Sequence, residues 1–139
     1  MSATADHAEG LAGRLGFRKG QVVQELGYDD DCDQDLRTAI ASTTGGELVD
    51  EDFDDVVDAV VLWWRDDDGD LVDALVDSLI SLGDGGVVWL LTPKAGREGH
   101  VEPGDIGDAA PTAGLHQTSS VSAAADWSGT RLVTRKSGR

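Results

Sequence analysis

Apolar residues follow two spacings along this chain, one typical of buried strands and one typical of helices. Gln21–Leu26 is a short apolar-rich strand candidate, and two other short runs, Val56–Trp64 and Val87–Leu91, are almost continuous in apolar character and rich in β-branched residues. Such runs are typical of strands that are buried on both faces, as in a parallel sheet. Because successive strand residues face opposite sides of a sheet, we expect at least two of Trp63, Trp64 and Trp89 to pack in the core.

An aspartate-rich stretch follows the second of these runs and marks a change to helical spacing. After "RDDDGD", leucines recur every four positions from Leu71 to Leu79. Asp70, Asp73 and Asp77 fall on the opposite side of the same helix. Aspartates at the first turn of a helix accept hydrogen bonds from free N–H groups and suit the positive end of the helix dipole. The sequence therefore predicts an amphipathic helix, and the start of this helix explains much of the acidic run.

Three further helices are predicted from shorter patterns. Leucine spacing predicts one at Ala8–Leu15, and the aspartates of "GYDDDCD" suit the start of another at Asp33–Thr43. A third is expected to begin near Pro103 and to end or kink at Pro111. The segment "GDGG" is interpreted as the end of the amphipathic helix, since glycine is common just after helix ends.

Weaker strand patterns complete the chain. A brief strand is predicted at Glu47–Val49. The segment "LHQTSSVSAAADWSGTRLVTRK" predicts two strands joined by a turn near Asp126–Gly129.

The order of these elements predicts an α/β fold in a single domain. Strands alternate with helices and a hairpin closes the chain, so we expect a small open, mostly parallel sheet with helices on both faces and a C-terminal antiparallel hairpin. The domain is expected to span residues 8–134, between a flexible N-terminus (1–7) and a basic tail (135–139). Three loops, "GYDDDCD", "RDDDGD" and "TPKAGREGH", are expected to meet beyond the carboxyl ends of the strands, where such sheets bind ligands.

The protein is strongly acidic, with 27 Asp and Glu residues, 11 Lys and Arg residues and a formal charge of −16. From Glu25 to Asp84 there are 20 acidic residues against Arg37 and Arg65, a net charge of −18. This distribution argues against nucleic acid as a partner, because nucleic-acid binding needs a basic surface. Solubility alone is an equally good explanation of the acidity.

Several features indicate a cytoplasmic location. No run approaches the roughly 18 apolar residues of a membrane-spanning helix. The segment "MSATADHAEG" lacks the basic start and apolar stretch of a secretory signal. Cys32 is the single cysteine, so it has no partner for an intramolecular disulfide. We therefore expect a reduced setting and no membrane association.

The first loop does not resemble a cofactor site. A nucleotide or S-adenosylmethionine site needs several glycines there, whereas "VVQELGYDDDCD" offers only Gly27, followed by aspartates that would repel phosphate. The alternating aspartates from Asp29 and from Asp66 lack the glycine that a calcium-binding EF-hand loop needs, so helix capping is preferred over a metal site. We expect no cofactor and no metal.

No catalytic residue is assigned from the sequence. Ser128 lacks the glycine-flanked elbow of hydrolase nucleophiles. Cys32 lies among aspartates, which we expect to raise the pKa of its thiol. His7, His100 and His116 are scattered along the chain.

Two surfaces are candidates for binding. The first is acidic: Asp70, Asp73 and Asp77 on the outer side of the predicted helix, with Glu51 to Asp55 in a nearby connector, suit a protein partner with a basic surface. The alternative is a solvated helix face without a partner.

The second candidate is the loop "TPKAGREGHVEP", where Lys94, Arg97 and His100 suit a small anion such as a carboxylate or phosphate. The alternative is that Lys94 and Arg97 pair with Asp29–Asp31 or Asp66–Asp68 on neighbouring loops and close the crevice.

The segments "LTPKAGREGHVEP" and "DWSGTRLV" are similar to an uncharacterised family of small actinobacterial proteins, domain of unknown function 3052, and the likeness runs from about Leu11 to Val133. This resemblance implies no established activity. More distantly, the order of elements resembles the class I methyltransferase fold, with "VVQELG" as its first strand, "DAVVLWW" as its fourth and "VVWLL" as its fifth. The chain departs from that fold at the glycine loop and lacks the full set of early strands and a ribose-binding acid.

The interpretation favoured by these observations is a non-enzymatic cytoplasmic module that binds a protein partner or a small anion and acts as a regulator or accessory subunit. The alternatives are a shortened methyltransferase-like transferase and a dimerising scaffold.

Overall fold

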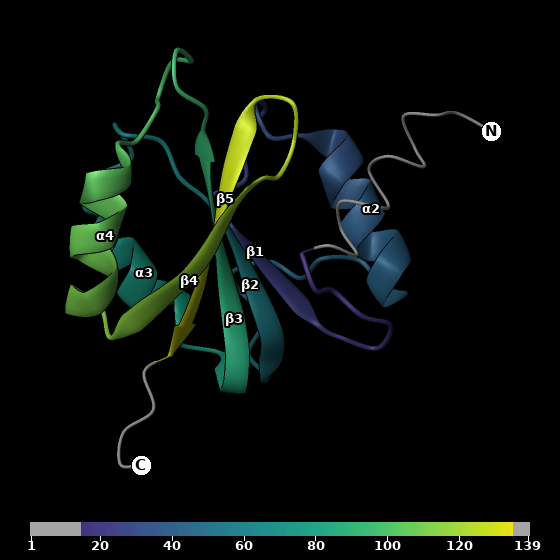
Figure 1. The fold of residues 1–139 in the computed structure, drawn as a ribbon. Helices are drawn as coiled ribbons and strands as arrows, with labels where there is room; N and C mark the ends of the chain where they lie inside the picture. The colour runs from purple at the N-terminus through teal and green to yellow at the C-terminus, as the bar shows by residue number, and fades with distance from the viewer. Residues whose placement is uncertain (1–14, 135–139) are drawn as a thin grey trace.

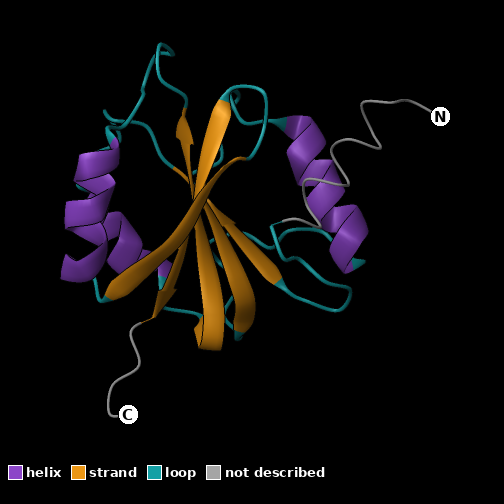
Figure 2. Ribbon diagram, in the orientation of Figure 1, coloured by secondary structure: helices purple, strands orange, loops and turns teal. Residues whose placement is uncertain are grey.

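A five-stranded sheet runs through the centre of this computed structural model, which describes residues 15–134 (Figures 1 and 2). In chain order the elements are β1 (Val23–Leu26), α2 (Gln34–Thr44), β2 (Val57–Trp63), α3 (Leu71–Ser78), β3 (Leu82–Pro93), α4 (Pro103–Thr112), β4 (Leu115–Ser122) and β5 (Trp127–Thr134). The predicted helix at Ala8–Leu15 lies outside the described residues except for its last position, as do the predicted terminal segments 1–7 and 135–139.

The strand order is β1-β2-β3-β5-β4. Strands β1, β2 and β3 are parallel, whereas β5 is antiparallel to both β3 and β4. The predicted open α/β sheet with a C-terminal antiparallel hairpin is therefore confirmed, and the sheet as a whole is mixed, with two parallel and two antiparallel pairings.

Helices cover both faces of the sheet, as predicted (Figure 1). Helix α2 covers one face and places Leu36 and Ile40 in a core with Trp63 and Trp89. Helices α3 and α4 cover the other face, where the core includes Trp64. All three predicted core tryptophans are buried, and adjacent Trp63 and Trp64 serve opposite layers because successive strand residues point to opposite sides.

Two helix starts are capped by aspartates, as the sequence predicts. The Leu36 N–H donates to the Asp33 side chain at 2.8 Å, and the Asp73 N–H donates to the Asp70 side chain at 3.2 Å. These bonds satisfy N–H groups that have no partner within the helix.

Strand β3 is longer than the sequence predicts and absorbs "GDGG". Helix α3 ends at Ser78, and the glycines belong to the strand instead of ending the helix. The pairing with β2 shifts between Val57 and Ala59, which pair with Leu82 and Val87. Gly85 has a positive φ of 78°, and this conformation lets β3 bulge.

The hairpin turn lies earlier than predicted. Strand β4 ends at Ser122 and β5 begins at Trp127, so Gly129 belongs to a strand and not to the turn. A Cβ on Gly129 would lie 3.2 Å from the Trp89 ring, and Trp127 packs edge-on against Trp63 with centroids 4.8 Å apart. Long-range packing therefore places this segment in the sheet, against its local turn preference.

The brief strand predicted at Glu47–Val49 is reduced to one parallel bridge between Val49 and Gln24. The Glu25 N–H donates to the Val49 carbonyl at 2.7 Å, and the Val49 N–H donates to the Val23 carbonyl at 2.9 Å. The connector after α2 thus pairs with the outer side of β1. Helix α4 ends one residue after Pro111, in keeping with the sequence. Among residues 15–134, no helix has the length and apolar character needed to cross a membrane.

Candidate functional site

The three predicted loops meet beyond the carboxyl ends of β1, β2 and β3. Arg65, the residue after Trp64 at the end of β2, contacts the loop after β1. The Asp66 N–H donates to the Gly99 carbonyl at 2.9 Å, which joins the loop after β2 to the loop after β3. The prediction that these loops converge is confirmed.

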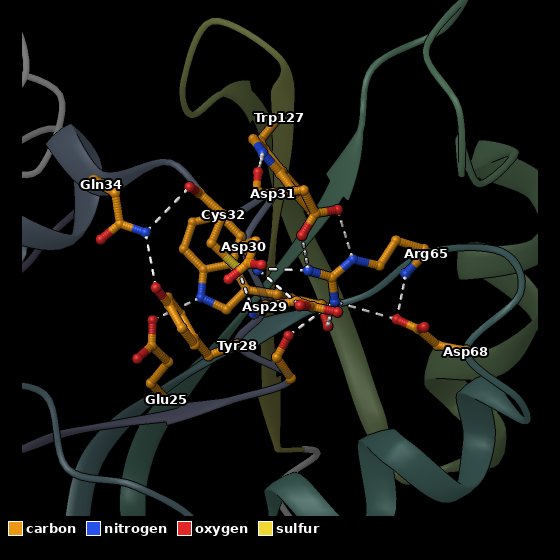
Figure 3. A network of polar contacts seen from close by, with 12 residues as sticks. Glu25, Tyr28, Asp29, Asp30, Asp31, Cys32, Gln34, Arg65, Asp68 and Trp127 are labelled. Atoms are coloured by element: carbon orange, nitrogen blue, oxygen red, sulfur yellow. Dashed lines mark hydrogen bonds and ion pairs between the residues drawn. The ribbon is translucent and has the colours of Figure 1, made fainter.

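Arg65 lies at the centre of this convergence (Figure 3). Its guanidinium forms a two-pronged ion pair with Asp31, with one nitrogen-oxygen distance of 3.0 Å. It also donates to the Gly27 carbonyl at 2.8 Å and approaches the Asp68 carboxylate at 3.3 Å. We call Gly27, Asp31, Arg65 and Asp68 the Arg65 cluster.

Aromatic and backbone contacts hold the Arg65 cluster in place. The guanidinium carbon lies 5.2 Å from the centroid of the Trp127 ring, and the Trp127 indole N–H donates to the Asp31 carbonyl at 3.2 Å. The Arg65 side chain is only 12% exposed. A planar guanidinium suits this position because it can pair with a carboxylate, donate to carbonyls and stack on a ring at once.

Glycines allow the three loops to approach closely. Gly27 has a φ of +77°, and a Cβ there would lie 2.2 Å from the Trp63 carbonyl oxygen. Gly99 has a φ of +86°, and a Cβ there would lie 3.1 Å from the Arg65 Cβ. The glycine of the first loop therefore permits contact with β2 of the same chain, whereas in nucleotide-binding folds such a glycine admits a ligand.

Charge pairing and burial set the titration of this site. Hydrogen bonding to Arg65 lowers the pKa of Asp31 below its ordinary value. Burial opposes the charged form of Arg65, but the hydrogen bonds to Asp31 and Asp68 outweigh this effect and raise its pKa. Burial raises the pKa of the Cys32 thiol to about 11. The predicted direction for Cys32 is thus right but the main cause is different: desolvation dominates, and the Asp31 charge contributes least.

A second charged group is buried under the first loop. Glu25 is 7% exposed, and Arg37 of α2 donates to both of its oxygens, at 2.6 and 2.8 Å. The Trp63 indole N–H donates to the same carboxylate at 2.9 Å. The Arg37 guanidinium also lies over the Tyr28 ring, 4.3 Å from its centroid. The pair is fully hydrogen-bonded, and it fixes α2 against the carboxyl end of β1.

A groove of about 620 Å³ remains open beside the Arg65 cluster, between α3 and the loops after β1 and β2. We call it the α3 groove. Its lining residues are Gln24, Leu26, Gly27, Tyr28, Asp29, Glu51, Leu62, Trp63, Trp64, Arg65, Asp68, Ala74, Asp77, Ile80 and Ser81. The lining combines an apolar and aromatic floor with four carboxylates, and its single basic group, Arg65, already pairs with Asp31 and Asp68. Such a groove favours a cation over an anion.

The three residues of the predicted anion loop each have a partner in the protein. The Lys94 ammonium donates to the Ser122 hydroxyl at 2.6 Å. Arg97 pairs with Asp126 at 2.6 Å, with both side chains about half exposed. His100 places Nδ1 2.8 Å from the Pro93 carbonyl and Nε2 3.4 Å from a Glu102 oxygen.

The internal pairing proposed as the alternative for Arg97 therefore exists, with a different acid. Asp126 lies on the β4–β5 turn, whereas Asp31 and Asp68 pair with Arg65. Anion binding by Lys94, Arg97 and His100 stays a prediction.

The acidic residues predicted to bind a partner differ in their surroundings. Asp70 caps α3, Asp73 and Asp77 are exposed on that helix, and Asp77 lines the α3 groove together with Glu51 of the connector. Across residues 15–134, no three His, Cys, Asp or Glu side chains are arranged to hold a metal ion.

Sequence reasoning missed Arg65 and Glu25. A signal for Arg65 was available, because it is one of only two basic residues among 20 acidic ones between Glu25 and Asp84. Glu25 interrupts an apolar strand, and a charge within such a strand calls for a buried partner.

Comparison with solved structures identifies the fold as that of class I methyltransferases. The mitomycin 7-O-methyltransferase MmcR superposes with a TM-score of 0.67 and 12% identity, covering 96% of this chain and 55% of that one. The O-methyltransferase NcsB1 from neocarzinostatin biosynthesis gives 0.67 and 15%, covering 94% and 55%. The CcbJ methyltransferase from Streptomyces caelestis gives 0.59 and 10%, covering 96% and 97%. This chain thus spans 55% of the length of the first two, and at such identities the likeness concerns the fold alone.

Sequence relatives are closer. Uncharacterized proteins of Mycobacterium bovis (Mb2263c) and Mycobacterium tuberculosis (Rv2239c) are each 55% identical over 133 residues, covering 96% of this chain and 84% of theirs. The family described as "Protein of unknown function (DUF3052)" matches residues 12–136. Since that match covers nearly the whole chain, the protein belongs to this family, as its sequence motifs suggested.

Proposed function

We propose that this protein is a non-catalytic binding module, built on a shortened methyltransferase-like fold, that recognises a protein partner with a basic surface. One observation carries the non-catalytic part: beyond the ends of β1 and β2, where folds of this kind hold a ligand, Arg65 is paired with Asp31 and Asp68 of the protein itself. Gly27 packs against the Trp63 backbone, so this glycine is not free to let a cofactor approach the first loop closely.

The charge of the molecule supports a basic partner. Asp77 of α3 and Glu51 of the connector are exposed and line the α3 groove, and the single basic group of that groove is already paired. A field of one sign attracts an oppositely charged protein and speeds its association, most strongly at low salt.

The test is calorimetric titration of the full chain with S-adenosylmethionine and, separately, with a lysine-rich peptide. We expect no heat with S-adenosylmethionine, and peptide binding that weakens steeply as salt rises. Saturating S-adenosylmethionine at about 100 times its Kd would stabilise the fold by about 2.7 kcal/mol. A rise in melting temperature that corresponds to this stabilisation by S-adenosylmethionine would contradict the proposal.

A methyltransferase-like transferase is the second candidate function, and one observation favours it. The Val49 bridge places the connector beside β1, in the position of a second parallel strand. Glu51 follows that bridge and lines both the α3 groove and a neighbouring hollow of about 410 Å³. Nucleotide-binding α/β folds use an acid about 20 residues after the glycine loop to hold a ribose, and Glu51 stands 24 positions after Gly27.

If the second candidate is right, Glu51→Ala abolishes the thermal shift caused by S-adenosylmethionine. The exposed acid Asp84 lies outside both hollows, so Asp84→Ala should leave that shift unchanged and serves as the matched control.

A further inference from the structure

One residue that lines the α3 groove, Trp64, carries an indole N–H that donates to no other residue of the described range 15–134. Trp64 lines the groove and is 8% exposed. The other three indole N–H groups donate to Glu25, to the Leu15 carbonyl and to the Asp31 carbonyl. The Trp64 N–H has no such acceptor, yet no fully buried side-chain nitrogen or oxygen in the described part of the chain lacks a hydrogen-bond partner. Its N–H is therefore in contact with solvent, and Trp64 is one of the residues that line the groove.

The wall of the groove is apolar and exposed where α3 ends. Ile80 lines the groove and is 79% exposed, and Val76, one turn earlier, is 46% exposed. Single exposed apolar residues are common, but these two are only four positions apart where α3 ends, and Ile80 lines the same groove as Trp64. The surface offers burial to an apolar side chain of a ligand.

The rim of the groove is negative. Asp77 of α3, Glu51 of the connector and Asp29 of the first loop are all exposed and all line the groove. A ligand that fits must bring a positive group for the rim, an apolar group for Ile80 and an acceptor for the Trp64 N–H. A peptide with lysine or arginine next to an apolar residue supplies all three, since its backbone carbonyls are acceptors.

We propose that the α3 groove binds a short basic segment of a partner protein. A lysine or arginine of that segment lies between Glu51 and Asp77, an apolar neighbour packs on Ile80, and a backbone carbonyl accepts from Trp64. This inference rests on the proposed function, because it assigns the basic partner to one defined groove on the acidic surface.

The probe is a fluorescein-labelled peptide of lysines and leucines at helical spacing, titrated with the full chain at low salt and followed by fluorescence anisotropy. Asp77→Lys should weaken binding on the order of tenfold, because it places a like charge in the rim. Asp108→Lys makes the same charge change at an exposed position of α4 outside the groove, and should weaken binding only about twofold.

Two further variants test the apolar wall and the floor. Ile80→Asp should reduce affinity on the order of tenfold by removing the apolar contact and adding repulsion. Trp64→Phe keeps the ring but removes the donor, and should weaken binding about threefold. Asp77 and Ile80 are exposed, so their variants should keep the urea midpoint of the wild type.

The outcomes separate this inference from the proposed function. If the wild type binds the peptide but Asp77→Lys and Asp108→Lys weaken it equally, binding follows the overall charge, and the groove assignment is overturned while the basic partner survives. Unchanged affinity in Ile80→Asp has the same meaning. If the wild type does not bind the peptide at low salt, the proposed function falls as well.

Two experiments test whether something other than a partner protein occupies the α3 groove. Replacement of Arg135, Lys136 and Arg139 by Gln would raise peptide affinity if the chain's own basic tail filled the groove, and that result overturns the partner proposal. A wild-type dimer that becomes a monomer in Asp77→Lys would identify a second copy as the occupant, and would overturn it too.

Discussion

Arg65 connects segments that are far apart in the sequence. Its guanidinium joins Asp31 and the Gly27 carbonyl, which precede it by 34 and 38 positions, to Asp68 in its own loop. A charge with little exposure is tolerated only where its donors are satisfied, and here carboxylates and carbonyls accept from them. Arg65 thus holds the loop after β1 against the loop after β2.

Gly27→Ala should be strongly destabilising. The residue has a positive φ, and a Cβ would lie 2.2 Å from a backbone oxygen that has little room to move. We expect a loss of about 2–4 kcal/mol in the free energy of unfolding, measured by urea denaturation. Gly96→Ala is the matched control, because Gly96 has a φ of +85° but nothing within 4 Å of a Cβ. The control should lose only about 1 kcal/mol. Equal losses in the two variants would mean that the contact with Trp63 has no cost.

Asp31 should give the stability a dependence on acid pH. Arg65 depresses its folded-state pKa below the ordinary value of 3.8. The stabilisation is therefore fully present above that value and is lost as the pH falls through the folded-state pKa. We expect Asp31→Asn to be less stable than the wild type at pH 6, by up to about 1 kcal/mol because Asp31 is half exposed. The two proteins should converge at the acid end.

The measurement is urea denaturation at several pH values below 6. Asp30→Asn removes a neighbouring exposed carboxylate that lies outside the Arg65 cluster, and should keep the slope of the wild type. A wild type and Asp31→Asn that lose stability in parallel would contradict the assignment of this ion pair.

At the scale of elements, the loop between β3 and α4 is attached to the hairpin. The Lys94 N–H donates to the Asp126 carbonyl at 2.9 Å, and Arg97 pairs with the carboxylate of the same residue. Gly99 then packs on Arg65. The loop therefore serves as a bridge between the β4–β5 turn and the Arg65 cluster.

Arg97→Ala should lower stability by no more than about 1 kcal/mol, because both partners in its ion pair are about half exposed. Phosphate decides between the two alternatives for this loop: if Lys94, Arg97 and His100 only serve their protein partners, phosphate should raise the melting temperature of the wild type no more than sodium chloride at equal ionic strength. Arg131→Ala, on β5, is the control for loss of one positive charge. A rise specific to phosphate that Arg97→Ala abolishes would instead establish the predicted anion site.

At the scale of the whole molecule, charge of one sign is concentrated on part of the chain. Residues 25–84 carry 20 acidic and two basic residues. They form the end of β1, all of α2, β2 and α3, and the start of β3, so both helical layers share the charge. Like charges on a compact fold repel one another, and salt screens this repulsion.

Added salt should therefore stabilise the protein. Raising sodium chloride from about 0.01 M to about 0.15 M shortens the Debye length from about 30 Å to about 8 Å. We expect a gain on the order of 1 kcal/mol in the free energy of unfolding, measured by urea denaturation. In a variant that combines Asp73→Asn and Asp77→Asn the gain should be smaller. Stability that falls with salt would mean that the ion pairs of Arg37 and Arg65 outweigh the repulsion.

Local patterns in the sequence were enough to predict most helices and strands, the layers and the open sheet with its C-terminal hairpin. A continuous apolar run and helical apolar spacing are both local patterns, so they predicted β2 and α3 to within a residue or two at their starts. The alternation of side chains along a strand separated Trp63 from Trp64. The capping aspartates Asp33 and Asp70 could also be predicted, because a cap accepts from an N–H only three positions later in the sequence.

Contacts between distant segments determine which charged residues form ion pairs and to which element Gly129 belongs. The sequence offers several carboxylates that could pair with Arg65. The register of β1 beside β2 places Asp31 and the Gly27 carbonyl within hydrogen-bonding distance of it. Likewise, the antiparallel pairing of β3 with β5 places Pro93 opposite Trp127, so the loop that holds Arg97 lies beside Asp126. Gly129 belongs to a strand because it pairs with Leu91 of β3, and a Cβ there would come within 3.2 Å of the Trp89 ring. These choices depend on contacts between residues distant in the sequence, and no local pattern encodes such distances.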